Sequence, residues 1–217
     1  MIGERLGASV LSVKVISNIS PSMAKSLNLQ EHHHSLGLIT SNCDDVTYVA
    51  LDEATKAASV DVVYARSFYG GADNATTKLA GEVIGILAGP SPAEVKSGLA
   101  VAVQEIEEGA SFISANDDNS IPYFAHCVSR TGTHLSKEAG VEEGQALAYL
   151  IAPPLEAMYG LDAALKSADV EIAAFYGPPS ETNFGGGLLT GSQSACHAAC
   201  EAFSQAVEQV AQNPLDY

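Results

Sequence analysis

The chain has 217 residues, of which 47% are hydrophobic and 17% charged, and its 10 basic and 26 acidic residues give a formal net charge of −16. This length allows one large domain or two small ones, and the apolar fraction excludes a disordered chain. The acidic balance excludes an ordinary nucleic-acid binder, because so few basic side chains cannot neutralise a row of phosphates. Without a membrane-length apolar stretch or a signal-peptide pattern, we expect a cytoplasmic protein whose four cysteines stay reduced.

The first half of the chain predicts an α/β unit. Apolar or alternating runs of strand length cover residues 13–19, 36–41, 46–51, 60–69 and 81–89. Asp52 is expected to cap a short helix over 52–59. Ser91, Pro92 and Glu94 form the start signal of a longer helix, with apolar residues at helical spacing behind them.

An internal repeat with a period near 110 residues divides the chain. Residues 52–62 read against 162–172 without a gap, at an offset of 110. Three weaker matches follow the same order along the chain, at offsets of 112, 111 and 102. We therefore expect two copies of one α/β unit, residues 1–110 and 111–217, the second ending in a helix over about 192–212.

Each copy carries an irregular segment between its two long strands, at residues 68–78 and 176–187. Glycine, proline, asparagine and serine at this density do not form regular structure. Long irregular loops in compact domains usually serve a function, so we expect a used surface, with a tolerated insertion as the alternative.

Metal-binding or nucleophilic side chains occur in three groups. The run His32, His33 and His34 could capture a transition metal, but a solvated polar turn is favoured and we expect no metal. Cys196, His197 and Cys200 could also be metal ligands, but an interpretation as small packing residues is favoured. His126 and Cys127 could form a nucleophilic pair, but neighbours on a strand usually point apart.

Carboxylates are the remaining chemical resource. Asp44, Asp45 and Glu82 could attract a small cation such as a protonated amine, although for the Asp pair the sequence alone favours a plain exposed turn. No cofactor motif or activated nucleophile is recognisable, which favours a structural or assembling protein over an enzyme. Sparse charge also suits large protein–protein contacts, whose cores are depleted in charged residues.

Segments spread over nearly the whole chain resemble one known family. They are residues 35–41, 44–48, 52–56, 82–83, 89–94, 128–132, 152–156, 162–169, 179–183 and 189–193. Together they resemble the bacterial microcompartment shell proteins of ethanolamine utilisation. The resemblance implies an α/β (α+β) fold of two tandem, circularly permuted microcompartment domains, each a small, mainly antiparallel sheet flanked by helices.

The resemblance further implies a homotrimer with a pseudohexagonal outline that tiles with other shell proteins into the microcompartment shell. Such proteins have a gated central pore and smaller pores within each subunit. The gating loops would contain Tyr69, Gly70, Gly71, Tyr176, Gly177, Pro178, Pro179, Ser180 and Glu181. An ethanolamine-binding small pore would be lined by Asp44, Asp45, Glu82, Phe112, Thr182 and Asn183. The resemblance implies that ethanolamine is bound or transported. Cobalamin is a second candidate for transport, although no motif in the sequence supports it.

One other class stays open at this point, a trimeric small-molecule sensor of tandem α/β repeats that does not assemble into a shell. The charge divides unevenly between the copies, at −6 for residues 1–110 and −10 for 111–217. A subunit that packs side by side with others in a shell would explain why charged residues are sparse, because its rim is buried against neighbouring chains. It also predicts that carboxylates gather at pore mouths and disc faces.

Overall fold

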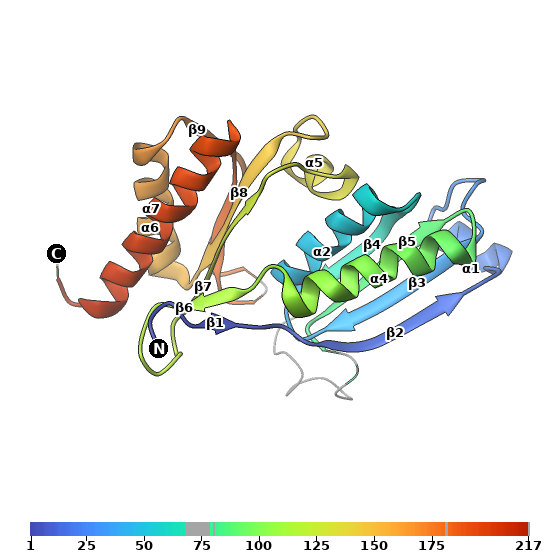
Figure 1. The fold of residues 1–217 in the computed structure, drawn as a ribbon, viewed down its shortest axis with the longest axis horizontal. Helices are drawn as coiled ribbons and strands as arrows, with labels where there is room; N and C mark the ends of the chain where they lie inside the picture. The colour runs from blue at the N-terminus through green and yellow to red at the C-terminus, as the bar shows by residue number, and fades with distance from the viewer. Residues whose placement is uncertain (68–78, 80, 181, 217) are drawn as a thin grey trace. The chain divides into compact units, whose positions relative to one another are not determined.

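The structure is a computed structural model that describes residues 1–217 except 68–78, 80, 181 and 217. The chain forms two compact units (Figure 1). The N-terminal unit comprises Gly7–Ala110 with Gly132–Leu135, and the C-terminal unit comprises Met1–Leu6, Ser111–Thr131 and Ser136–Tyr217. One short segment from each half of the sequence therefore belongs to the unit that is built mainly from the other half.

The N-terminal unit is a four-stranded antiparallel sheet in the order β2-β3-β5-β4. Its strands are β2 (Val10–Ile16), β3 (Ser35–Ser41), β4 (Asp61–Ser67) and β5 (Val83–Gly89). Its helices are α1 (Pro21–Ser26), α2 (Asp44–Ala57) and α4 (Pro92–Glu108). Helices α2 and α4 pack against each other and against the sheet (Figure 1). The helices lie close to the sheet because Gly37 of β3 and Gly85 of β5 lack a Cβ. A Cβ at these positions would lie 2.7 Å from side-chain atoms of Val95 and Leu51 respectively.

The C-terminal unit is a six-stranded antiparallel sheet in the order β1-β6-β7-β8-β10-β9. Its strands are β1 (Arg5–Leu6), β6 (Phe112–Ser114), β7 (Pro122–Val128), β8 (Ala146–Ala152), β9 (Val170–Tyr176) and β10 (Gly185–Gly191). Its long helices, α6 (Pro154–Ser167) and α7 (Gln193–Gln212), pack on each other and on the sheet. The short α5 (Thr133–Ala139) precedes β8.

The repeat is visible in the fold. The strand order β2-β3-β5-β4 recurs as β7-β8-β10-β9. Helices α2 and α6 have 14 residues each, and every residue of α6 lies 110 positions after its counterpart in α2. Helix α5 begins 112 positions after α1, and β10 begins 102 positions after β5. The expected tandem α/β fold of mainly antiparallel sheets flanked by helices is confirmed.

Helix α2 corrects one sequence prediction. The sequence predicts a strand over 46–51 and a short helix capped by Asp52, but a single helix runs over Asp44–Ala57 with Asp52 in its interior. Within this helix, residues 46–51 are mostly apolar and are buried or half-buried, so they show no helical alternation of polar and apolar side chains. A short apolar run of this kind is easily mistaken for a buried strand.

The start of α4 is as predicted, with Pro92 as its first residue and the Ser91 hydroxyl accepting the Glu94 amide at 3.3 Å. The expected reciprocal bond of a capping box is absent among the described residues: the Glu94 carboxylate accepts the Ser59 amide at 2.8 Å instead. Glu94 therefore ties α4 to the turn before β4.

Candidate functional site: an acidic cluster at the start of α2

Three carboxylates gather in the N-terminal unit where α2 and β5 begin. Asp44 and Asp45 are the first two residues of α2 and are buried, and Glu82, partly buried, directly precedes β5. The Glu82 amide donates to the Ser41 carbonyl oxygen at 2.8 Å, which fixes Glu82 beside the end of β3. The fold thus brings together acids that lie almost 40 positions apart in the sequence, and the expected exposed Asp–Asp turn is wrong.

The turn before α2 is held by side-chain hydroxyls. The Ser41 hydroxyl accepts the Cys43 amide at 3.1 Å and lies 2.6 Å from the Thr47 hydroxyl. Thr47 donates to the Cys43 carbonyl at 2.8 Å. Cys43, the N-cap residue, makes no side-chain capping bond, so the charges of Asp44 and Asp45 also stabilise the first turn of α2.

The acids influence each other electrostatically. Burial raises the pKa of Glu82, and repulsion from Asp44 adds to the shift. Burial raises the pKa of the Cys43 thiol well above its usual range, with the nearby acids contributing. The pKa of Tyr48 is raised to about 12, first by burial and further by Asp44 and Asp45. The site therefore concentrates negative charge, which favours the binding of a small cation.

The sequence singled out the three acids but missed Tyr48 and Cys43. Tyr48 lies one turn beyond Asp44, a spacing that would mark it as a neighbour only if residues 46–51 were recognised as helical.

Phe112, Thr182 and Asn183 lie in the C-terminal unit. The Phe112 ring stacks on Phe124 with centroids 5.2 Å apart and lies 6.2 Å from Phe184. The backbone amide of Asn183 donates to the Ser180 carbonyl oxygen at 3.0 Å, and Asn183 has a φ of 66°. Phe112 thus lies beside the turn that holds Thr182 and Asn183. The assignment of these three residues to an ethanolamine site stays a prediction.

The expected gating residues fall only partly within the described chain, because Tyr69, Gly70, Gly71 and Glu181 lie outside it. Of the others, Tyr176 is the last residue of β9, and the connection from β9 to β10 contains Gly177, Pro178, Pro179 and Ser180. The Ser180 amide closes this turn by donating to the Phe184 carbonyl at 2.7 Å. Gly185 approaches Pro178 closely, since a Cβ on Gly185 would lie 2.6 Å from the Pro178 Cβ.

The histidine run has one partner that the sequence did not reveal, Asp61 at the start of β4. Nδ1 of the buried His33 accepts a hydrogen bond from the backbone amide of Gln30 at 3.2 Å. The ring proton is therefore on Nε2, which lies 2.8 Å from the Asp61 carboxylate. His32 Nε2 lies 3.7 Å from the same carboxylate, and the ligand atoms of His32, His33 and Asp61 are all within 4.8 Å of one another. A metal bound at His33 Nε2 would have to displace this proton and break the Gln30 contact.

The cysteines have the environment of packing residues. Cys196 and Cys200 are buried in the core of the C-terminal unit, whereas His197 between them is exposed. Burial raises the pKa of Cys127 to about 11, so this thiol is not an activated nucleophile, and its neighbour His126 stacks on Phe124.

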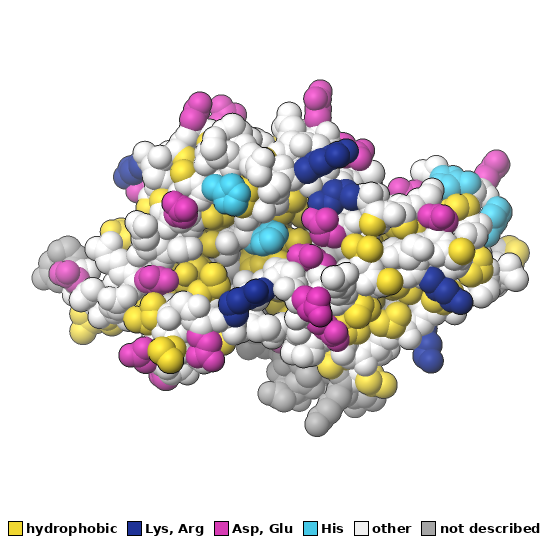
Figure 2. Space-filling view, viewed as in Figure 1, with side chains coloured by type: hydrophobic (Ala, Val, Ile, Leu, Met, Phe, Trp, Pro, Cys, Tyr) yellow, Lys and Arg dark blue, Asp and Glu magenta, His cyan; other side chains and the backbone are white. Residues whose placement is uncertain are grey.

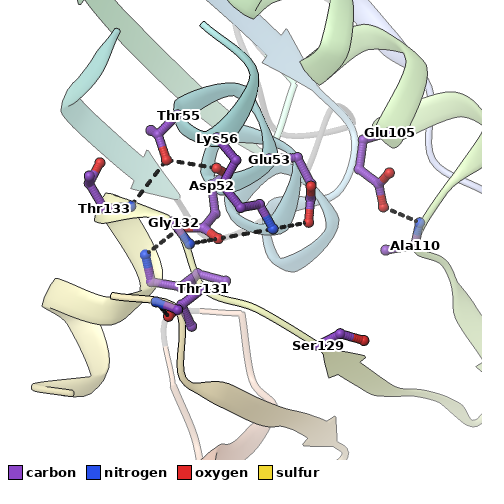
Figure 3. A network of polar contacts seen from close by, with 12 residues as sticks. Asp52, Glu53, Thr55, Lys56, Glu105, Ala110, Ser129, Thr131, Gly132 and Thr133 are labelled. Carbon is purple, nitrogen blue, oxygen red and sulfur yellow. Dashed lines mark hydrogen bonds and ion pairs between the residues drawn. The ribbon is translucent and has the colours of Figure 1, made fainter. Parts of the chain in front are cut away.

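The buried carboxylate of Asp52 has a role that sequence reasoning missed (Figure 3). It accepts the amides of Gly132 at 2.7 Å and Leu135 at 2.8 Å, both in the second copy of the repeat, and Lys56 Nζ lies 3.8 Å away. The Thr55 hydroxyl accepts the Thr133 amide at 3.1 Å. A Cβ on Gly132 would lie 2.3 Å from the Thr55 hydroxyl, so glycine is required for this approach. Asp52 therefore anchors residues of the second copy to α2.

The surface matches the composition, since Figure 2 shows acidic side chains scattered over the visible face with few lysines and arginines among them. None of the helices in the described part of the chain combines the length and apolar character needed to span a bilayer.

Comparisons with known proteins agree with this architecture. The BMC domain family model matches residues 35–120. The bacterial microcompartment shell protein EutL of Clostridium perfringens is 69% identical over the full length of both chains, and that of Escherichia coli is 54% identical over 95% of this chain and 94% of its own. The crystal structure of the ethanolamine utilization protein EutL from Leptotrichia buccalis superimposes with a TM-score of 0.98, at 71% identity and full coverage of both chains. The relatives are named for a structural rather than an enzymatic role, and the chain belongs to the EutL family of bacterial microcompartment shell proteins.

Proposed function

We propose that this shell protein forms trimers of pseudohexagonal outline that tile, with other shell proteins, into the shell around the enzymes of ethanolamine utilisation. Its two tandem copies of one unit support this, because three such chains supply six similar units for a ring. The family membership supports the location in a microcompartment shell.

We further propose that the acidic cluster is the charged part of a small pore that binds ethanolamine. Near neutral pH this ligand carries one ammonium and one hydroxyl. The observation that carries the proposal is the gathering of Asp44, Asp45 and Glu82, close enough for Asp44 to raise the pKa of Glu82. An ammonium between these carboxylates would relieve their repulsion through charge-assisted hydrogen bonds.

Calorimetric titration with ethanolamine tests the pore. Asp45→Asn should weaken binding at least tenfold, because a charge-assisted hydrogen bond is replaced by a neutral one worth about 1.5 kcal/mol less. The matched control is Asp169→Asn, an exposed acid of the C-terminal unit, which should bind as the wild type does. Ethanol, which lacks the ammonium, should not bind. Equal affinities of the two variants would contradict the assignment.

The pH dependence adds a second readout to the titration. Because the pKa of Glu82 is raised, this carboxylate loses its charge at a higher pH than an ordinary glutamate. Affinity for the cation should therefore fall on acidification through that range. The variant Glu82→Gln should bind more weakly and lose this part of the pH dependence.

The gate of the central pore is proposed for residues 68–78 and 176–187, on the resemblance and on their glycine-rich composition. The predicted irregular segment 176–187 is shorter than expected, because Tyr176 ends β9 and Gly185–Gly187 begin β10. Bound ethanolamine would bias this gate only by its difference in affinity for the open and closed states. Cobalamin as a transported ligand rests on the resemblance alone.

A further inference from the structure

The loop between α1 and β3 carries two histidines that share one carboxylate. His32 and His33 belong to this loop, and Asp61 is the first residue of β4. The Nε2 atoms of His32 and His33 lie 3.7 and 2.8 Å from Oδ2 of Asp61. Within the described part of the chain, this is the one group of three or more histidine, cysteine or acidic side chains whose ligand atoms all lie within 4.8 Å of one another.

Strand β5 holds both parts of this cluster in place. On one side of β5, Asp61 pairs with Ala88 in the ladder between β4 and β5. On the other side, the backbone amide of His34 donates to the Gly89 carbonyl oxygen at 3.0 Å, which fixes the end of the histidine loop. The sheet therefore brings the imidazoles and the carboxylate together by backbone hydrogen bonds, so the cluster is formed before any ligand binds.

His33 acts on the Asp61 carboxylate as a hydrogen-bond donor. Its side chain is only 3% exposed, and the Gln30 amide occupies Nδ1, so the proton on Nε2 points to Asp61. A histidine in this state has no lone pair on Nε2 for an ion. It orients the carboxylate instead, as the hydrogen-bonding partners of metal-binding carboxylates do. Since a carboxylate has several lone pairs, Asp61 can accept this proton and bind an ion at the same time.

His32 differs from His33 because it is open to water. Its side chain is 56% exposed and that of Asp61 46% exposed. Water can accept a proton from its Nδ1, which leaves the lone pair on Nε2 for an ion. Two donor atoms bound to one zinc ion at about 2.1 Å in tetrahedral geometry lie ~3.4 Å apart. The observed 3.7 Å between His32 Nε2 and Asp61 Oδ2 is close to this separation.

We propose that His32 Nε2 and the Asp61 carboxylate bind a divalent transition-metal ion such as Zn²⁺, with His33 holding the carboxylate in place and water completing the coordination. An imidazole beside a carboxylate suits Zn²⁺, Ni²⁺ or Cu²⁺, whereas Mg²⁺ and Ca²⁺ prefer oxygen ligands alone. The ion would tie the loop before β3 to the start of β4.

The proposed site differs from a metal site made by the histidine run alone. Asp61, far from the run in sequence, takes the place of His34, whose side chain is exposed and lies outside the cluster. The buried position of His33 also shows that a fully solvated turn does not describe this loop.

Calorimetric titration of the full chain, without a polyhistidine tag, with Zn²⁺ tests the site. The wild type should bind one more Zn²⁺ per chain than His32→Ala, which removes an exposed side chain. Asp61→Asn keeps an acceptor for His33 but loses the charge, so it should bind Zn²⁺ at least tenfold more weakly. The matched control is His34→Ala, which should bind as the wild type does. Ni²⁺ should compete with Zn²⁺, and Mg²⁺ should not.

Two substitutions of His33 separate its proposed role from direct binding of the ion. The side-chain amide of His33→Gln can still donate to Asp61, so the Zn²⁺ affinity should stay within about threefold of the wild type. His33→Ala has no donor and should bind about tenfold more weakly. If His33→Gln loses the site as completely as His32→Ala does, His33 is itself a ligand and the proposed arrangement is overturned.

Thermal unfolding gives an independent readout of the same site. An ion that binds the folded chain stabilises it, so Zn²⁺ should raise the unfolding temperature of the wild type and of His34→Ala more than that of His32→Ala. A wild type that matches His32→Ala in both the number of Zn²⁺ ions bound and the rise in unfolding temperature would overturn the site.

Discussion

Replacing Asp52 by alanine should lower the free energy of unfolding by about 3 kcal/mol, because it strands two buried amides at a cost of roughly 1–3 kcal/mol each. The Asp52 carboxylate is completely buried and is the acceptor for the amides of Gly132 and Leu135. Lys56 keeps its ion pair with Glu53, so the loss comes from the amides. Urea unfolding measures the change.

The control for this substitution is Asp169→Ala, which removes an exposed carboxylate and should cost less than about 0.5 kcal/mol. Hydrogen exchange gives a local readout, since the amides of Gly132 and Leu135 should lose protection in Asp52→Ala ahead of the β-sheet amides. A loss of stability within 1 kcal/mol of the control would show that Asp52 does not anchor the second copy.

The second large effect is expected for Gly81→Ala, at about 3 kcal/mol of destabilisation. Gly81 has a φ of +62°, and a Cβ there would lie 2.1 Å from the Ser41 carbonyl oxygen and 2.7 Å from Leu11 Cδ1. The strained conformation costs about 1 kcal/mol and the displacement of Ser41 about 2 kcal/mol more. Because Glu82 follows directly, the same change should also weaken the proposed binding of ethanolamine.

Gly140→Ala is the matched control, since Gly140 has a φ of +66° with nothing within 4 Å of its Cβ position. It should cost only the backbone part, about 1 kcal/mol. Thermal or urea unfolding of both variants separates the two contributions. Equal losses would mean that the contact with Ser41 relaxes freely and does not hold Glu82 in place.

The fold can be predicted from the sequence where local signals and the internal repeat agree. Ser91 and Pro92 mark the start of α4 because capping depends on neighbouring residues alone. The tandem architecture follows from a repeat that keeps α2 and α6 at one length and one offset. The sequence could name the three acids of the candidate site, but it does not distinguish buried carboxylates from exposed ones. Their gathering depends on the pairing of β3 with β5, which the sequence does not reveal.

What the sequence could not supply depends on contacts between distant segments. Asp52 looks like a helix cap in isolation, and only the fold shows that it holds amides 80 positions or more away. The bond between His33 and Asp61 likewise joins a loop to the start of another strand. The strand β1 forms only because Arg5 and Leu6 pair with β6, and a two-residue strand has no sequence signature of its own.

Electron microscopy of the purified full-length protein tests the central claim, assembly into a shell, most directly. The account predicts discs of pseudohexagonal outline, three chains each, that pack edge to edge into flat sheets as the protein concentration is raised. Discrete trimers that never form sheets at any concentration would contradict the tile and favour a soluble ligand-binding protein of the same fold.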